Sequence, residues 1–148
     1  MTITMTTSAA RAALIRSGHS AGAVAAGLLL NVVLSSAMDM LLVAIGIFPP
    51  LSDFDNPAAY SNFLLLLALG YRTLFGVFGC YVTARLAPRR PMAHALALGC
   101  IGVAIGVIGA AVTWDTWTHW YSLAIVAVAL PSSCLGGWIV QMQQTSLR

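Results

Sequence analysis

Residues 61–85 read SNFLLLLALGYRTLFGVFGCYVTAR, and this stretch decides the fold class. It is almost wholly apolar, and its only charged side chains are Arg72 and the terminal Arg85. A helix needs about 20 such residues to cross the hydrocarbon of a bilayer. Inside lipid, a single helix is able to satisfy its own backbone hydrogen bonds. The stretch therefore predicts a transmembrane helix, in which Arg72 is the residue that needs an explanation.

The whole chain shares this apolar character. Of its 148 residues, 59% are hydrophobic and 7% are charged, and the mean hydropathy is +0.89. A soluble domain has about a quarter of its residues charged, so the expected surroundings are a lipid bilayer. The pI is near 9.1, but the arginines other than Arg72 flank apolar segments. We therefore expect no nucleic-acid partner.

Four stretches are long and apolar enough to span a membrane, near residues 23–47, 61–85, 92–113 and 119–140. The connections between them are short and contain proline, aspartate or tryptophan: PPLSDFDNPAAY, APRRP and WDTWTHWY. These features predict one integral membrane domain over residues 1–148, an all-α bundle of four transmembrane helices with short loops. Residues 1–20 are expected to form a cytoplasmic tail, with either a short surface helix or a frayed end over 7–19.

The arginines predict the direction of the bundle. They precede the first span, flank the middle loop and close the chain, at Arg11, Arg16, Arg85, Arg89, Arg90 and Arg148. The other two loops carry aspartates and no basic residue. Because basic loops stay on the cytoplasmic side, both termini and the middle loop are expected to be cytoplasmic.

Two segments leave alternatives open. The tryptophans of WDTWTHW fit an aromatic belt at the membrane interface, although a ligand-binding aromatic cluster would have the same composition. Arg11 and Arg16, followed by an apolar stretch and LSSA at 34–37, resemble a secretory signal with a cleavage site. The apolar run continues to Phe48, which favours a membrane span.

Arg72 has a candidate partner in Asp39, the acidic residue inside the first predicted span. A charge in hydrocarbon is costly and normally faces a partner inside the bundle. Asp39 lies about 13 Å from the Phe48 end of its span, and Arg72 about 16 Å from the Ser61 end of the next. Because helical side chains lean toward the N-terminus, the two heads converge between antiparallel helices. We therefore predict an Asp39–Arg72 ion pair.

The surrounding residues extend this contact into two stripes. Asn31 and Ser35 precede Asp39 at intervals of four and form a polar stripe on the first span. The second span carries a matching stripe of small and polar residues, namely Ala68, Arg72, Gly76, Gly79 and Thr83. Small residues permit close helix approach, so we expect the stripes to face each other. The ion pair is then either a structural clamp or a functional site.

The third span contains Gly99, Gly102, Gly106 and Gly109 on one helix face. This groove predicts close packing, either within the bundle or between copies of the chain. Pro131 predicts a kink in the fourth span. The three cysteines have no metal-ligand spacing. No catalytic motif occurs, so we expect neither enzymatic activity nor a cofactor or metal, although His94 beside the arginines of the middle loop leaves a lipid-acting enzyme open.

Three runs of sequence carry a family resemblance: MDMLLVAIGIFPP, YRTLFGVFGCYVTARLAPRRPMAHALALG and WYSLAIVAVALPSSCLGGW. They resemble a group of small four-helix bacterial membrane proteins that are generally catalogued as uncharacterised. The resemblance covers about residues 25–140 and implies a bacterial inner-membrane location, but no activity. Its pattern includes Asp39, Pro49, Arg72, Tyr81, Arg85, Pro91, His94 and Pro131.

These observations favour a non-enzymatic role as a structural or accessory subunit of a membrane assembly. Its partners would be the lipid bilayer and either another membrane protein or further copies of itself. The alternative is a small oligomeric transporter or channel with an intramembrane site at Asp39 and Arg72. A water-filled cavity that reaches Asp39 or Arg72 is expected of the transporter, whereas a dry contact argues against it.

Overall fold

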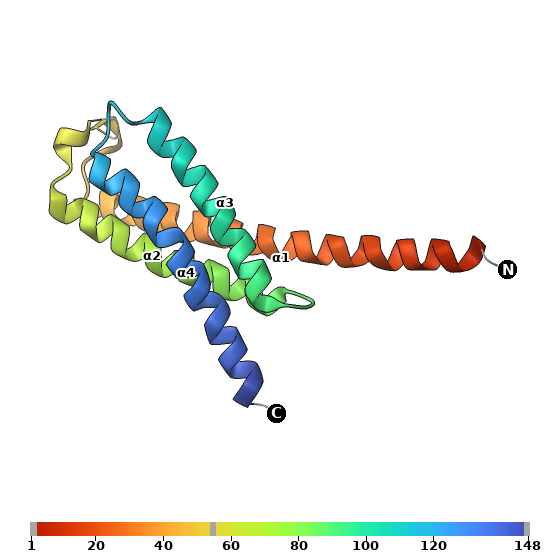
Figure 1. Cartoon of the computed structure of the whole chain (residues 1–148). Coiled ribbons are helices and arrows are strands. Elements are labelled where there is room, and N and C mark those ends of the chain that lie inside the picture. Colours follow the sequence, from red (N-terminus) through yellow and green to blue (C-terminus); the bar gives the residue numbers. More distant parts are fainter. Residues whose placement is uncertain (1–2, 54–55, 147–148) are drawn as a thin grey trace.

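The computed structural model describes residues 3–53 and 56–146, with side chains described from Gly18 onward apart from Pro57. Its regular elements are helical (Figure 1): α1 (Ile3–Ala44), α2 (Asn62–Leu86), α3 (Pro91–Val112) and α4 (His119–Ser146), with the 3₁₀ turns η1 (Leu51–Asp53) and η2 (Pro57–Ala59) between α1 and α2. Each long helix contains a segment whose length and apolar composition suit a membrane span. The all-α fold with four such helices is as predicted.

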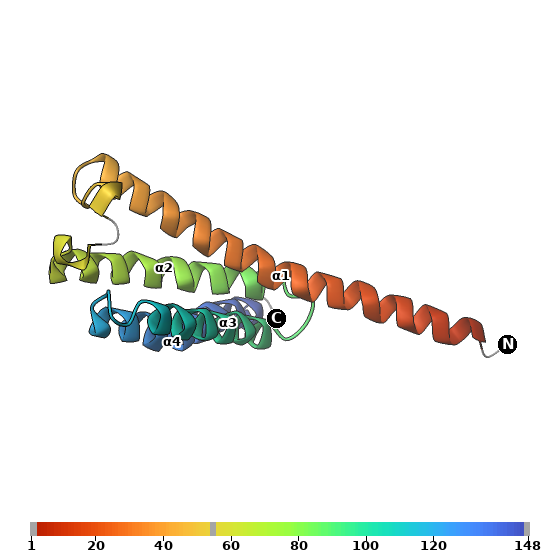
Figure 2. The same cartoon turned by 90° about the horizontal axis from the view of Figure 1, so that it is seen from above.

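The first helix differs from its predicted bounds at both ends. It runs from Ile3 without interruption, so residues 3–20 belong to the same helix as the first span, and their cytoplasmic position stays a prediction. The segment is rich in alanine and has no proline, which favours continued helix. In Figures 1 and 2 the N-terminal part of α1 extends beyond the other three helices.

At its other end, α1 stops at Ala44 and not at residue 47 as expected. Gly46 adopts a left-handed conformation with φ 74°, which glycine reaches without steric cost. The amides of Ile47 and Phe48 then donate to the Leu42 carbonyl at 2.9 and 3.0 Å. A left-handed glycine with such bonds is a common helix terminator.

The helices form layers with α2 in the middle. Helix α1 packs mainly on one side of α2, whereas α3 and α4 pack against each other and against its other side (Figure 2). Helix α1 makes fewer contacts with α3. The space between α1 and the α3–α4 pair is therefore less completely filled than the rest of the bundle.

Glycines bring helices close on both sides of α2. On the α1 side, a Cβ added to Gly79 would lie only 2.7 Å from the Gly27 carbonyl oxygen. On the α4 side, a Cβ added to Gly136 would lie 2.6 Å from the Val77 carbonyl oxygen. Both crossings therefore depend on the missing side chain, as is common where membrane helices pack closely.

The glycine stripe on α3 divides between two environments. Gly99, Gly102 and Gly106 face α4, where their nearest neighbours are Ser133, Ala129 and Val126. A Cβ at Gly109 would meet no described atom within 4 Å. Three members of the predicted groove thus pack within the bundle, and the fourth borders open space.

Helix α4 continues through Pro131 as one element, His119–Ser146. The buried Ser133 hydroxyl donates to the Leu130 carbonyl oxygen at 2.7 Å.

Candidate functional site

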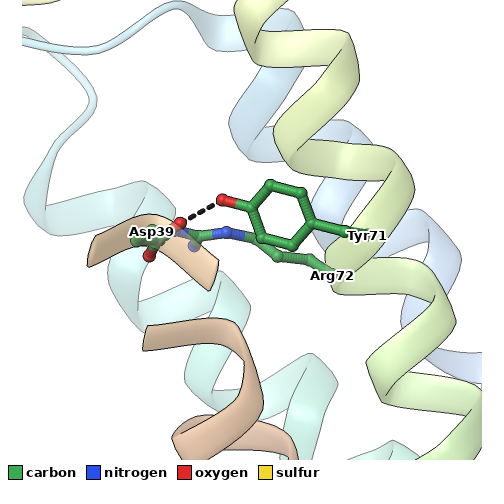
Figure 3. A network of polar contacts seen from close by, with 3 residues as sticks. All are labelled: Asp39, Tyr71 and Arg72. Carbon is green, nitrogen blue, oxygen red and sulfur yellow. Dashed lines mark hydrogen bonds and ion pairs between the residues drawn. The ribbon is translucent and has the colours of Figure 1, made fainter. Parts of the chain in front are cut away.

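The structure brings Asp39 and Arg72 together across α1 and α2. Arg72 Nη2 lies 2.7 Å from Asp39 Oδ2. Arg72 is ten residues from the start of α2, whereas Asp39 is only five from the end of α1. The difference is bridged because the long Arg72 side chain leans toward the N-terminal end of its helix. Figure 3 shows it reaching from α2 toward Asp39.

Tyr71 completes a three-residue network with the ion pair. Its hydroxyl donates a hydrogen bond to Asp39 Oδ1, the carboxylate oxygen that Arg72 does not use (Figure 3). The Arg72 guanidinium also lies 6.0 Å from the centre of the Tyr71 ring. Two consecutive residues of α2 therefore hold one carboxylate of α1.

The hydrogen-bonding groups of Asp39 are more completely paired in this network than those of Arg72. Both carboxylate oxygens of Asp39 accept a hydrogen bond. Arg72 has five N–H donors, and its buried Nε has no hydrogen-bond partner in the described part of the chain. The unused hydrogen-bonding capacity of the network is therefore mostly donor capacity.

One cavity lies beside the pair, toward the end of the bundle that carries the α1–α2 and α3–α4 loops. Its volume is about 490 Å³, and its walls come from all four helices and both loops. Much of the wall is aromatic, from Phe48, Tyr60, Trp117 and Tyr121. Asp39 and Arg72 are the charged residues among those that line it. We call it the loop-side cavity.

The second cavity, of about 360 Å³, lies on the opposite side of the pair, and we call it the terminus-side cavity. Its polar lining includes Asn31, Ser35, Thr73 and Ser132. Asn31 Oδ1 is buried without a hydrogen-bond partner among the described residues. An unsatisfied buried carbonyl oxygen is costly and favours a water molecule or another donor in this cavity.

The ion pair stands where the two cavities meet. Both cavities are lined by Ser36, Asp39, Arg72, Gly106 and Ile125. The Arg72 side chain remains 36% exposed and that of Asp39 24% exposed, so the contact is accessible to a small molecule. The pair is therefore not fully enclosed by packed side chains.

The predicted stripes meet in part. Asn31, Ser35 and Asp39 face the cavities together with Ala68, Arg72 and Gly76, while Gly79 packs on Gly27 and Asn31. A Cβ on Gly76 would have Ser132 of α4 as its nearest neighbour. Gly27 was not among the predicted site residues, although it continues the four-residue spacing of Asn31, Ser35 and Asp39.

The aromatic residues near the loops have two roles. Trp114 is 43% exposed and stacks on His119, as an interfacial residue would. Trp117 instead lines the loop-side cavity, with its ring 5.4 Å from that of Tyr60. Burial, followed by the nearby Asp39 charge, raises the pKa of Tyr60 above its ordinary value. The sequence cluster WDTWTHW therefore contributes to a cavity wall as well as to the surface.

The histidines lie apart from the cavities. His94 Nδ1 lies 3.2 Å from the Arg90 carbonyl oxygen, and His119 Nε2 lies 2.9 Å from the Trp114 carbonyl oxygen. None of the three histidines, His19, His94 and His119, lines either cavity. Among the described residues, no group of histidine, cysteine and acidic side chains is arranged to hold a metal ion.

The four long apolar helices indicate a multi-pass membrane protein. No family model, curated protein or solved structure matches the chain. Its function is therefore argued from the geometry around Asp39 and Arg72, and the resemblance to small bacterial four-helix proteins stays a prediction.

Proposed function

We propose that the protein is a small transporter that binds a solute at the Asp39–Arg72 pair within the membrane. The observation that carries this proposal is the position of the pair at the junction of two cavities. Transporter sites lie near the bilayer midplane and are reached from either side in turn. A non-enzymatic binding role suits these residues better than catalysis, because none of the three histidines lines the cavities.

The energetic argument points the same way. An intramembrane ion pair that serves only to hold two helices is best surrounded by packed side chains, because open space forfeits their contacts. Here the pair is partly exposed to two cavities. Retaining charged groups in such a place is typical of substrate and ion pathways. The pair still joins α1 to α2, so the clamp and the site are two roles of the same contact.

The arginine distribution supports a direction for this path. We propose a bacterial inner-membrane location with both termini and the α2–α3 loop in the cytoplasm, by the rule that basic loops remain inside. In that orientation the loop-side cavity belongs to the outer half of the membrane and the terminus-side cavity to the inner half. The exchange between them would be controlled by the contact of Asp39 with Arg72.

A structural or accessory subunit remains the second candidate, and the exposed flank of α1 favours it. Leu29, Val33 and Leu41 are 64%, 60% and 52% exposed on this helix. Helix α1 packs mainly on α2, so a partner helix or another copy of the chain has room to seat beside it. In that case the occupant of the cavities is protein or lipid.

Thiol accessibility distinguishes the two candidates. In a protein whose three cysteines are replaced by alanine, Thr113→Cys reports on the loop-side cavity and Ser35→Cys on the terminus-side cavity. Leu29→Cys is the matched lipid-facing control, because Leu29 is exposed and lines neither cavity. A membrane-impermeant cationic methanethiosulfonate is added to right-side-out and to inverted vesicles.

A transporter should react at Thr113→Cys from the outside and at Ser35→Cys from the inside, while Leu29→Cys stays unmodified. If both cavity positions behave like Leu29→Cys, the cavities hold lipid or a partner helix. The transporter proposal is then wrong, and purification in mild detergent should recover a larger assembly.

A further inference from the structure

We propose that the loop-side cavity binds an amphipathic organic anion, with its apolar body between the aromatic side chains and its anionic head on Arg72. The inference rests on the proposed function and names the class of solute. It draws on the size of the cavity, the chemistry of its wall and the donors that Arg72 leaves unused.

The cavity is of the right size and character for such a molecule. Its volume of about 490 Å³ falls within the range of about 300–1,000 Å³ that small-molecule sites occupy. Apart from the ion pair, the wall is formed mainly by apolar and aromatic side chains, among them Met40, Leu65 and Ile125. A molecule that fills this space must be largely apolar and must place its polar group at the pair.

The hydrogen-bond inventory decides the sign of that polar group. Asp39 already accepts from Tyr71 on one oxygen and from Arg72 on the other. Each carboxylate oxygen keeps one further lone pair, but the Asp39 side chain is the less exposed of the two, at 24% against 36% for Arg72. The Nε of Arg72 has no partner among the described residues but is itself buried, whereas the two terminal nitrogens donate one bond, from Nη2 to Asp39, and keep further N–H groups for a ligand. A guanidinium matches a carboxylate or sulfonate with paired, charge-assisted bonds, so an anionic head uses what the site leaves free.

The aromatic wall is held by its own contacts and not by the ligand. Phe48 meets Tyr60 edge-on at 5.9 Å between ring centres, and Trp117 lies 6.5 Å from Tyr121. Offset and edge-on ring pairs of this kind are favourable. The rings come from the two loops and the start of α4, so they form a lining into which a flat or extended apolar body fits.

The bound anion would compete with Asp39 for Arg72. Asp39→Asn therefore leaves Arg72 with an uncompensated charge and should tighten anion binding by at least about tenfold. A purely structural pair predicts the opposite, because loss of Asp39 would then only disturb the site. The direction of this change separates a binding role from a clamp.

The anion has two possible sources with the same chemistry. A fatty acid would enter from the bilayer, whereas an aromatic acid would enter from water. The headgroup of an ordinary phospholipid stays at the interface, so it would not reach Arg72. Decanoate and indolepropionate represent the two sources in a binding experiment.

The experiment measures binding to the purified full chain in nanodiscs by calorimetry. Three indole probes share one body and differ in the head: indolepropionate is anionic, tryptophol is neutral and tryptamine is cationic. We expect indolepropionate, decanoate or both to bind at least about tenfold more tightly than tryptophol and tryptamine. Arg72→Lys should keep part of this preference and Arg72→Gln should remove it.

A pair of glycine variants places the ligand without touching the ion pair. Gly109→Leu extends a side chain into the loop-side cavity, where a Cβ meets nothing within 4 Å. Gly70→Leu is the matched control, since it is equally unobstructed, exposed and outside both cavities. Anion binding should fall by at least about tenfold in Gly109→Leu and stay within about twofold in Gly70→Leu.

Three results would overturn the inference: tighter binding of tryptamine or tryptophol, equal affinity in the two glycine variants, or weaker anion binding by a folded Asp39→Asn protein. Tighter binding of tryptamine would leave the proposed transporter standing with a different solute. Whether the protein is a transporter at all is tested separately, by the thiol accessibility of the two cavities.

Discussion

Gly27 of α1 and Gly79 of α2 meet where the two helices cross, with the Gly27 carbonyl oxygen 2.7 Å from the place that a Cβ on Gly79 would take. This contact lies to one side of the Asp39–Arg72 pair, and the two together fix α1 against α2. Helix α1 packs mainly on α2 and makes fewer contacts with α3. The shape of both cavities therefore depends on this crossing.

Gly79→Ala should destabilise the protein because the new methyl group meets backbone that is unable to move aside. Overpacking of this kind costs about 1–3 kcal/mol, and we expect a lower midpoint of thermal unfolding in detergent. Gly70→Ala is the control, because its Cβ meets nothing within 4 Å and alanine favours helix over glycine by about 1 kcal/mol. Equal midpoints for the two variants would show that the crossing is not close in the folded protein.

The ion pair gives a prediction about coupling. Removing one partner of a buried pair costs about 3–5 kcal/mol, and the partial exposure of Asp39 and Arg72 places the cost at the lower end. We expect Asp39→Asn and Arg72→Gln each to lower the free energy of unfolding, and the double variant to lose less than the sum of the two. Unfolding of all four proteins in a denaturing detergent series measures this difference. Strict additivity would contradict a direct interaction.

Tyr71→Phe tests the third member of the network. It removes the hydroxyl that donates to Asp39 and keeps the ring that packs near Phe75. A hydrogen bond to a charged group contributes about 1.5–3 kcal/mol, so the unfolding free energy should fall by about that amount while the helix content measured by circular dichroism stays unchanged. An unchanged unfolding free energy would mean that Tyr71 does not hold the carboxylate.

Removal of two buried hydroxyls should have opposite effects on stability. Thr83 is fully buried and its hydroxyl has no partner among the described residues, whereas the equally buried Ser133 donates to Leu130. Removing an unsatisfied buried hydroxyl relieves a cost of about 1–3 kcal/mol, and removing a satisfied one costs about 1 kcal/mol. The midpoint of thermal unfolding should therefore be equal to or higher than that of wild type for Thr83→Val, and lower than that of wild type for Ser133→Ala. The reverse order would indicate a partner for Thr83 in the folded protein.

The sequence predicted the parts of this molecule that depend on local composition. Apolar length alone marks the four helices, and two opposite charges at comparable depth mark Asp39 and Arg72 as neighbours. The end of α1 at Ala44 was missed because the left-handed turn at Gly46 lies within an apolar run that looks like continued helix. Of the two alternatives for residues 7–19, a helix is present, but it continues directly into the first span, and the composition did not predict that continuity.

The cavities were beyond sequence reasoning for a different reason. Gly99, Gly102, Gly106 and Gly109 are equivalent in spacing, and only the path of α4 decides that three are covered while Gly109 borders open space. Likewise, Trp114 and Trp117 belong to one aromatic cluster, but only Trp117 faces the loop-side cavity. Such differences depend on where the helices move apart, and the local pattern of the amino-acid sequence does not predict that.

Ser36 and Ala37 provide a test of passage between the cavities. Ser36 lines both cavities at their junction, whereas the adjacent Ala37 lines neither, and both are exposed on α1. A phenylalanine at position 36 should fill the junction without disturbing a packed contact, whereas one at position 37 should lie outside it. Efflux of naphthalenesulfonate, which is permanently charged and crosses lipid poorly, is measured from proteoliposomes. We expect the efflux rate of Ser36→Phe to fall to that of protein-free liposomes, because a blocked junction stops a solute however well it binds. The efflux rate of Ala37→Phe should match that of wild type. If the two variants transport equally, the solute does not pass between the cavities at Asp39 and Arg72.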